Sequence, residues 1–263
     1  MKILFFGDVI GSAGRYALAE VIPKWRKKYD LDLVLANGEN LAHGKGVTRT
    51  TLNEILEAGV DLVTSGNDVW RNKEVQELLN NQDIPLIRPA NYPAQVPGQG
   101  WRLIKLRTKK ILVLNLIGRV FMHQQCDDPF RKADMILEEN EGLADMVIVD
   151  MHAEASSEKK ALAWYLDGRV TAVLGTHTHV PTADQRLLPQ GTAYITDIGM
   201  VGPYDSVIGA DKDIVLKRFL TQVPQHLELA KGLIEINAVL LEIDNKNKAK
   251  KIERLREIIG ENT

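Results

Sequence analysis

The sequence has a single cysteine, Cys126, so the chain cannot form an internal disulfide bond. One thiol in 263 residues is typical of a protein in a reducing compartment, and Cys126 is not predicted to bind metal. The sequence also lacks an apolar run long enough to span a bilayer, and its first residues have a strand pattern rather than that of a signal peptide. We therefore expect a cytoplasmic protein with no membrane partner.

The chain also lacks a strong excess of charge of either sign. Its formal net charge is -2 at pH 7, which argues against an extended nucleic-acid surface or a patch for acidic lipids. The basic runs 24–28 and 246–251 are typical of solvated helix faces. With 44% apolar residues, a chain of 263 residues can bury a full core, and we expect one domain over residues 1–263.

Three apolar segments early in the chain each end in polar side chains. Residues 2–6, 31–36 and 60–64 have the continuous apolar character of buried parallel strands. The side chains that follow them are Asp8, Glu39, Asn40, Asn67 and Asp68. Predicted helices at 11–28 and 48–58 separate the strands. This alternation predicts an α/β fold of βαβ units, whose strand ends meet at one functional edge.

Asp8 lies in a glycine-rich turn that is not a nucleotide-binding motif. Gly7, Gly11 and Gly14 do not have the spacing of G-x-G-x-x-G, and no Lys-Ser/Thr pair follows as in a P-loop. An aspartate inside a phosphate cradle would repel the anion unless a cation lay between them. A metal ligand is therefore the favoured role, although a cap or turn aspartate is the commoner use of such a position.

The second half of the chain adds three histidines after apolar segments. His152 follows residues 146–151, and His177 and His179 follow the apolar run 172–174. In an extended segment, residues i and i+2 point the same way, about 6 to 7 Å apart. We therefore expect His177 and His179 to approach two metal ions, about 3.5 to 4 Å apart, from the same side. A structural role for partly buried histidines is the alternative.

The other elements say less about function. Their patterns predict helices at 72–80, 127–140, 156–166, 211–220 and 245–259, hairpins at 101–116 and 184–195, a strand pair at 233–243, and loops at 84–100 and 196–209. The last of these loops is rich in glycine, and we expect it to lie beside the site.

Oxygen and imidazole ligands make up the pooled candidate site. Its members are Asp8, Glu39, Asn40, Asn67, His152, His177 and His179. This mixture suits two iron or manganese ions, or zinc, better than calcium or magnesium. His43 and Lys45 follow Asn40 in the same loop, and we expect these three residues to contact substrate. An ordinary Asn-Gly turn is the simpler explanation for that loop.

The order of the motifs resembles that of the calcineurin-like metallophosphoesterases. These motifs are Gly7-Asp8, Gly38-Glu39-Asn40, Gly66-Asn67-x-x-Trp70, a strand-end His152 and Gly175-Thr176-His177-Thr178-His179. Over nearly the whole chain the sequence is similar to the YmdB-like branch, metal-dependent phosphodiesterases associated with 2',3'-cyclic nucleotides. The resemblance implies a four-layer α/β/β/α sandwich. It also implies that Asp8 and His179 bind one metal near Asn40, that Asn67, His152 and His177 bind the other, and that Glu39 bridges the two.

One residue departs from the family pattern, which has histidine where this chain has Asp68. That histidine is the family's catalytic group for the leaving oxygen or the transition state. A carboxylate repels a phosphoryl group, and it is ionised at neutral pH unless its pKa is raised. We therefore expect metal binding to survive and turnover to be weakened. A role for Asp68 as an extra metal ligand is left open.

The leading hypothesis is a dinuclear phosphodiesterase in which a bridging hydroxide attacks phosphorus in line. By resemblance, its substrates are small phosphodiesters such as cyclic nucleotides or RNA ends. A second hypothesis is a metal-loaded, nucleotide-binding regulatory protein with little or no catalysis. An amidohydrolase-type enzyme is disfavoured, because its His-x-His motif would follow the first strand. The sequence leaves the oligomeric state open, a homo-oligomer included.

Overall fold

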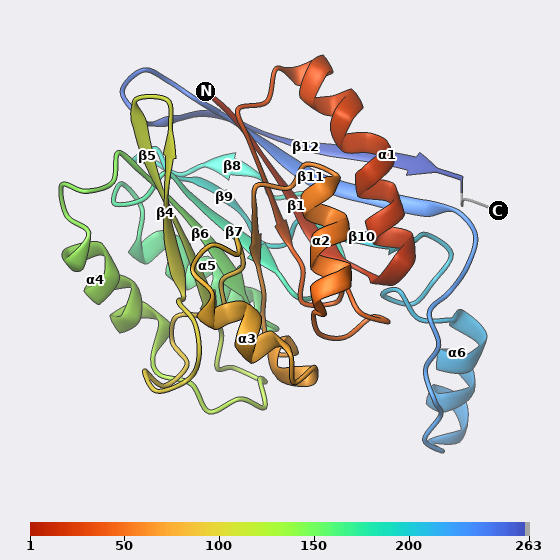
Figure 1. Cartoon of the computed structure of the whole chain (residues 1–263). Helices are drawn as coiled ribbons and strands as arrows, with labels where there is room; N and C mark the ends of the chain where they lie inside the picture. The colour runs from red at the N-terminus through yellow and green to blue at the C-terminus, as the bar shows by residue number, and fades with distance from the viewer. Residues whose placement is uncertain (261–263) are drawn as a thin grey trace.

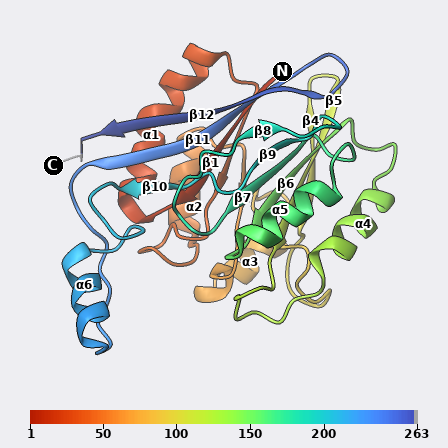
Figure 2. The ribbon, with the colours of Figure 1, turned by 180° about the vertical axis from the view of Figure 1, so that it is seen from behind.

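Two six-stranded sheets pack face to face between helices in the computed structural model, which describes residues 1–260 (Figures 1 and 2). One apolar cluster, which includes Phe5 and Leu174, lies between the sheets, and two further clusters lie between each sheet and its helices. These layers confirm the expected four-layer sandwich. The expected domain over residues 1–263 stays a prediction, and its last three residues lie outside the described residues.

The first sheet has the strand order β12 (Ala249–Ile259), β11 (Ile234–Ile243), β10 (Met200–Pro203), β1 (Lys2–Val9), β2 (Leu33–Asn37) and β3 (Leu62–Thr64). Strands β1, β2 and β3 are parallel. Their connections contain the helices α1 (Gly11–Tyr29) and α2 (Arg49–Glu57), which pack on the outer face of the sheet. The parallel strands therefore bring their carboxyl ends to the same edge, as the βαβ prediction requires.

The second sheet has the order β4 (Trp101–Leu106), β5 (Lys109–Ile117), β6 (Met146–His152), β7 (Ala172–Thr176), β9 (Ala193–Ile195) and β8 (Arg186–Leu187). Strands β5, β6, β7 and β9 are parallel. The helices α4 (Pro129–Glu139) and α5 (Ser156–Tyr165) cover the outer face. Both sheets thus contribute parallel strands whose ends can carry site residues.

Three short helices lie outside this regular pattern. They are η1 (Val69–Arg71), α3 (Val75–Asn80) and α6 (Lys212–Thr221). Helix α6 stands away from the sandwich in both views (Figures 1 and 2). None of the helices within residues 1–260 combines the length and the apolar character that crossing a membrane requires.

The helix predicted at 245–259 is wrong, because most of this segment forms the edge strand β12. Ile252, Leu255 and Ile259 have helical spacing, but β12 pairs antiparallel with β11 along its length. A turn at 244–248, in which Asp244 Oδ1 accepts hydrogen bonds from two backbone amides, starts the hairpin. The lysines and arginines of the segment suit an exposed sheet edge. Tertiary pairing therefore overrides the helical pattern.

Two other predictions in this region need correction. The strand pair predicted at 233–243 is one strand, β11, whose partners are β12, β10 and β1. The predicted loop 196–209 contains β10, which pairs with β1 and β11. The sequence does not predict this strand, because it contains Gly202 and Pro203 and both residue types are typical of turns.

Gly175→Ala should destabilise the fold by roughly 3 kcal/mol, since overpacking a core forces backbone shifts. A Cβ atom on Gly175 would overlap the backbone carbonyl of Thr196. Urea unfolding measures the effect. Gly260→Ala is the control, because a Cβ there meets no described atom within 4 Å. Equal midpoints for the two variants would contradict the requirement for glycine in β7.

Candidate metal centre

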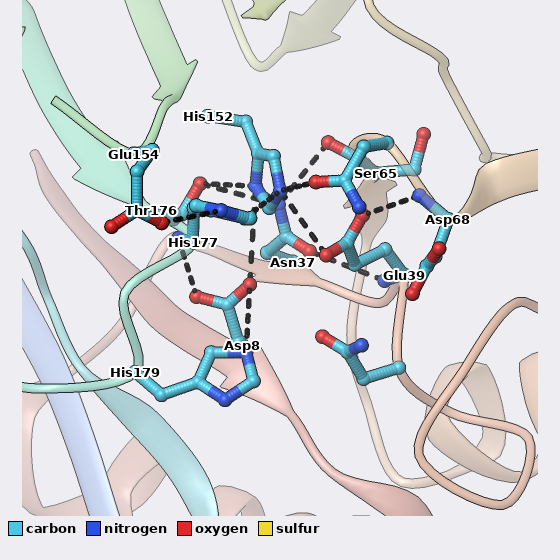
Figure 3. Close-up of polar contacts among 12 residues, drawn as sticks. Asp8, Asn37, Glu39, Ser65, Asp68, His152, Glu154, Thr176, His177 and His179 are labelled. Carbon is cyan, nitrogen blue, oxygen red and sulfur yellow. Dashed lines mark hydrogen bonds and ion pairs between the residues drawn. The ribbon is translucent and has the colours of Figure 1, made fainter. Parts of the chain in front are cut away.

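The ends of five strands meet at one edge of the sandwich. Figure 3 shows Asp8 from β1, Glu39 after β2, His152 from β6, and His177 and His179 after β7. The other two predicted site residues there are Asn40 after β2 and Asn67 after β3. The first sheet supplies four of these residues and the second supplies the three histidines. The site therefore depends on how the two sheets pack on each other.

His152 Nε2 is the centre of one group of contacts. It lies 3.1 Å from Glu39 Oε1, 3.2 Å from Asn67 Oδ1 and 3.0 Å from His177 Nδ1. A ring nitrogen carries at most one hydrogen, so it cannot bond well to all three neighbours. Ligand atoms of Glu39, His152 and His177 all lie within 4.8 Å of one another. Such a convergence of lone pairs fits a cation.

Asp8 and His179 form a second group beside the first. Asp8 Oδ1 is 3.9 Å from both His179 Nε2 and His152 Nδ1. Among residues 1–260, neither Asp8 Oδ1 nor Asn40 Oδ1 has a hydrogen-bond partner, although both atoms are buried. A buried, unpartnered oxygen destabilises the fold unless a ligand satisfies it. The residues present therefore fit a bound metal ion at this position as well.

A buried hydroxyl orients the ring of His152. Thr176 Oγ1 lies 2.7 Å from Asp150 Oδ1 and donates its hydrogen to that carboxylate. It therefore accepts the hydrogen of His152 Nδ1, which is 2.9 Å away. In the neutral ring this leaves Nε2 with a free lone pair toward Glu39. Metal-binding histidines commonly have such a partner on the other nitrogen.

His177 and His179 have partners of the same kind. Glu154 Oε2 lies 3.1 Å from His177 Nε2, and the carbonyl of Ile208 lies 3.0 Å from His179 Nδ1. In each ring, one nitrogen thus donates a hydrogen bond away from the cluster, and the other nitrogen is left with a lone pair that can bind a metal ion. The sequence predictions missed all of these orienting groups. Asp150 shares a strand face with His152, which is a usable signal, whereas the carbonyl of Ile208 has no signal in the sequence.

The extended conformation expected for His177 and His179 is wrong. Strand β7 ends at Thr176, and the two histidines have φ angles of 101° and 64°. Thr178 between them is fixed by Asp197, which accepts hydrogen bonds from its backbone N and its hydroxyl. His177 therefore turns toward His152, and His179 turns toward Asp8 (Figure 3). The two rings lie in different groups of contacts rather than side by side.

Burial and charge shift the pKa values of the central side chains. Burial alone would lower the pKa of His152, but the carboxylates of Glu39, Asp8 and Asp150 raise it to about 9. Burial raises the pKa of Asp8 to about 6. Burial and His152 lower the pKa of His177 to about 3. A proton on His152 therefore supplies positive charge to the acidic cluster, as a cation would.

The site opens into a cavity of about 390 Å³. His43 and Lys45, predicted to contact substrate, line it together with Asn40. Asp68 also lines the cavity, and its carboxylate accepts a hydrogen bond from Arg71 Nε at 2.9 Å. The backbone N of Asp68 donates to Glu39 Oε2. The loop after β3 thus places Asp68 beside the cluster while its side chain pairs with arginine.

Known proteins match this chain over nearly its whole length. A family model described as "YmdB-like protein" matches residues 4–255. The 2',3'-cyclic-nucleotide 2'-phosphodiesterase of Bacillus subtilis is 47% identical, over 97% of this chain and 96% of that protein. The crystal structure of a hypothetical protein from Thermus thermophilus has a TM-score of 0.92 and 46% identity, over 98% of this chain and 99% of that one.

A more distant structure shares the fold alone. A putative 5'-nucleotidase from Staphylococcus aureus has a TM-score of 0.63 and 14% identity, over 99% of this chain and 54% of that chain. Its identity is too low to transfer residue roles, and the match shows only that the two chains share this sandwich fold.

Without metal, the chain should lose thermal stability as the pH rises from about 6.5 to about 9. Folding raises the pKa of His152 from 6.5 to about 9. Protonation of this ring therefore stabilises the folded state, and the contribution is complete at pH values below the pKa of the unfolded chain. This contribution disappears as the pH passes the folded value of about 9. Thermal unfolding in EDTA should show Tm falling by roughly 5 °C across this range.

His152→Gln should flatten this decline, because the titrating ring is gone. His123→Gln, at an exposed position, is the matched control and should keep it. A decline that persists in His152→Gln would assign the pH dependence to another group.

Proposed function

The chain belongs to the YmdB-like family, and on this premise we propose that it is a dinuclear metallophosphodiesterase that hydrolyses 2',3'-cyclic nucleotides. Family membership makes it a hydrolase of phosphate esters and implies divalent metal ions. The name of the Bacillus relative supports the substrate class. The observation that carries the dinuclear centre is a pair of oxygens, Asp8 Oδ1 and Asn40 Oδ1, that have no hydrogen-bond partner within residues 1–260 and accompany the convergent atoms around His152 Nε2.

The residues divide between two metal positions. We assign Asn67, His152 and His177 to one ion, Asp8, Asn40 and His179 to the other, and Glu39 to both. Iron or manganese suits this mixture of oxygen and imidazole donors, and zinc is the alternative. Two such ions, when bound, supply a nucleophile at neutral pH and neutralise the charge of the phosphoryl oxygens. The protein's own part is to fix the ligands through Thr176, Glu154 and the carbonyl of Ile208.

Two cavity residues are suited to the substrate. The ammonium group of Lys45 can pair with a phosphate oxygen, and His43 can bond to phosphate or ribose. Both side chains are exposed on the cavity, in the loop that also contains Asn40. They hold the substrate's phosphate toward the metal ligands.

Asp68 limits the chemistry that this chain can perform. A general acid that protonates the leaving oxygen contributes about 10² to 10⁴ in rate. A carboxylate paired with Arg71 lacks the imidazole's proton, and its charge repels the phosphoryl group. This pairing favours slow turnover, and in the limit a nucleotide-binding regulatory protein with little catalysis.

Asp68→His should raise the hydrolysis of 2',3'-cyclic AMP about 100-fold, since it restores a proton donor at the leaving oxygen. The rate is measured with added manganese or iron. Asp68→Asn separates the loss of negative charge from the gain of an imidazole, and it should have a smaller effect. If neither the natural chain nor Asp68→His exceeds the metal-only blank, the phosphodiesterase proposal fails. If the natural chain binds the nucleotide without hydrolysing it and Asp68→His hydrolyses it, the natural chain is a weakened enzyme.

Thr176→Val should weaken manganese binding about 10- to 100-fold, because His152 loses the partner that orients its ring. Isothermal titration calorimetry gives the affinity, and the natural chain should bind two ions. Thr64→Val is the matched control, because Thr64 also donates to Asp150 and no hydrogen bond joins it to His152 among the described contacts. Equal losses in the two variants would refute the orienting role of Thr176.

A further inference from the structure

Part of the lining of the cavity beside the metal ligands is apolar, and these residues are called the apolar wall. Its side chains are those of Ile10, Ile208, Leu227 and Leu229. None of these four side chains has a hydrogen-bonding group, whereas the rest of the lining carries carboxylates, amides and imidazoles, and it includes Glu228 between Leu227 and Leu229. The lining therefore has a charged part and an apolar part, and the proposed chemistry uses only the charged one.

The apolar wall is part of the framework of the site. The segments that lead into and out of α6 are joined where Ala230 N donates to Gly209 O and where an isolated bridge pairs Ala210 with Leu229. Leu229 then lies against the loops of the metal site. A Cβ atom on Gly11 would overlap its side chain, and one on Gly44 would lie 2.9 Å from it. The wall is thus seated on the backbone that carries the metal ligands.

Ile208 links the wall to the metal centre at the expense of backbone strain. Its φ angle is 49°, in the left-handed region that β-branched residues rarely adopt. Its carbonyl accepts the hydrogen of His179 Nδ1, while its side chain is 54% exposed on the cavity. Glycine or asparagine would hold the same carbonyl with less strain. The isoleucine therefore indicates a use for the side chain itself.

We propose that this wall binds the nucleobase of the substrate. The inference rests on the proposed function and extends it to the other end of the ligand. A nucleotide has a charged phosphate at one side of its ribose and, at the other, a planar base whose faces make apolar contacts, which matches the charged and apolar parts of the lining. The volume of about 390 Å³ lies within the usual range of small-molecule pockets. Because the four side chains of the apolar wall offer only apolar contacts, the wall should accept purines and pyrimidines alike.

The test compares adenosine 3'-phosphate with glycerol 2-phosphate, which has no base, by calorimetry in the presence of manganese. The natural chain should bind the nucleotide about 10-fold more tightly, from the apolar area that the base buries. Leu227→Ala and Ile208→Gly should each reduce this ratio about fivefold. Ile208→Gly keeps the carbonyl and relieves the strain, so it should fold. Leu220→Ala, on exposed α6, is the control and should keep the ratio.

Equal affinities of the natural chain for the two ligands would overturn the nucleobase site. The same conclusion follows if both wall variants keep the natural ratio. Hydrolysis of 2',3'-cyclic AMP is assayed in parallel. Hydrolysis without a preference for the base refutes the wall alone, whereas a preference without hydrolysis by either the natural chain or Asp68→His supports the wall and refutes the proposed activity.

Discussion

A concentration of buried negative charge and lone pairs is the constraint on which the rest of this structure depends. Asp8, Glu39 and Asp150 are almost fully buried beside His152, and they need compensating positive charge. A proton on His152 meets part of that need. A metal ion meets it better, because it also satisfies the oxygens of Asp8 and Asn40 that have no partner among residues 1–260. The apolar core between the sheets holds these groups together against their repulsion.

The architecture meets this constraint by using strand ends from both sheets. A buried strand has a fixed direction and register, so the side chain at its end is placed more accurately than one on a free loop. Around these ends, Thr176 and Glu154 fix the outward nitrogens of two histidines. Lys159 Nζ and Asp197 Oδ2 form a buried ion pair, 2.6 Å apart. Asp197 also accepts a hydrogen bond from Thr178 N, so the pair supports the loop that carries His177 and His179. Positioning therefore comes from ordinary fold contacts behind the ligands.

The residues predicted the βαβ units and the gathering of the site residues at one edge, because continuous apolar runs and strand-end polar groups report local order directly. The four layers were implied by the family resemblance. It failed where long-range contacts decide. The apolar residues of β12 have helical spacing, but the segment forms a strand because it pairs with β11. His177 and His179 look extended until their loop is fixed by Asp197. The carbonyl of Ile208 belongs to the backbone and has no residue signature. These features depend on contacts between segments far apart in the sequence, and local sequence patterns do not predict such contacts.

The double use of Ile208 has a consequence for how such a site can vary. Its carbonyl serves the metal centre and its side chain serves the apolar wall, so a change of backbone conformation there alters both. Leu227 contributes to the wall through its side chain, and it lies outside the loops that hold the histidines. In the proposed nucleobase site, specificity for the base can therefore change at Leu227 without moving a metal ligand. At Ile208 it is tied to the orientation of His179, and this coupling accounts for a strained residue where the charged and apolar parts of the lining meet.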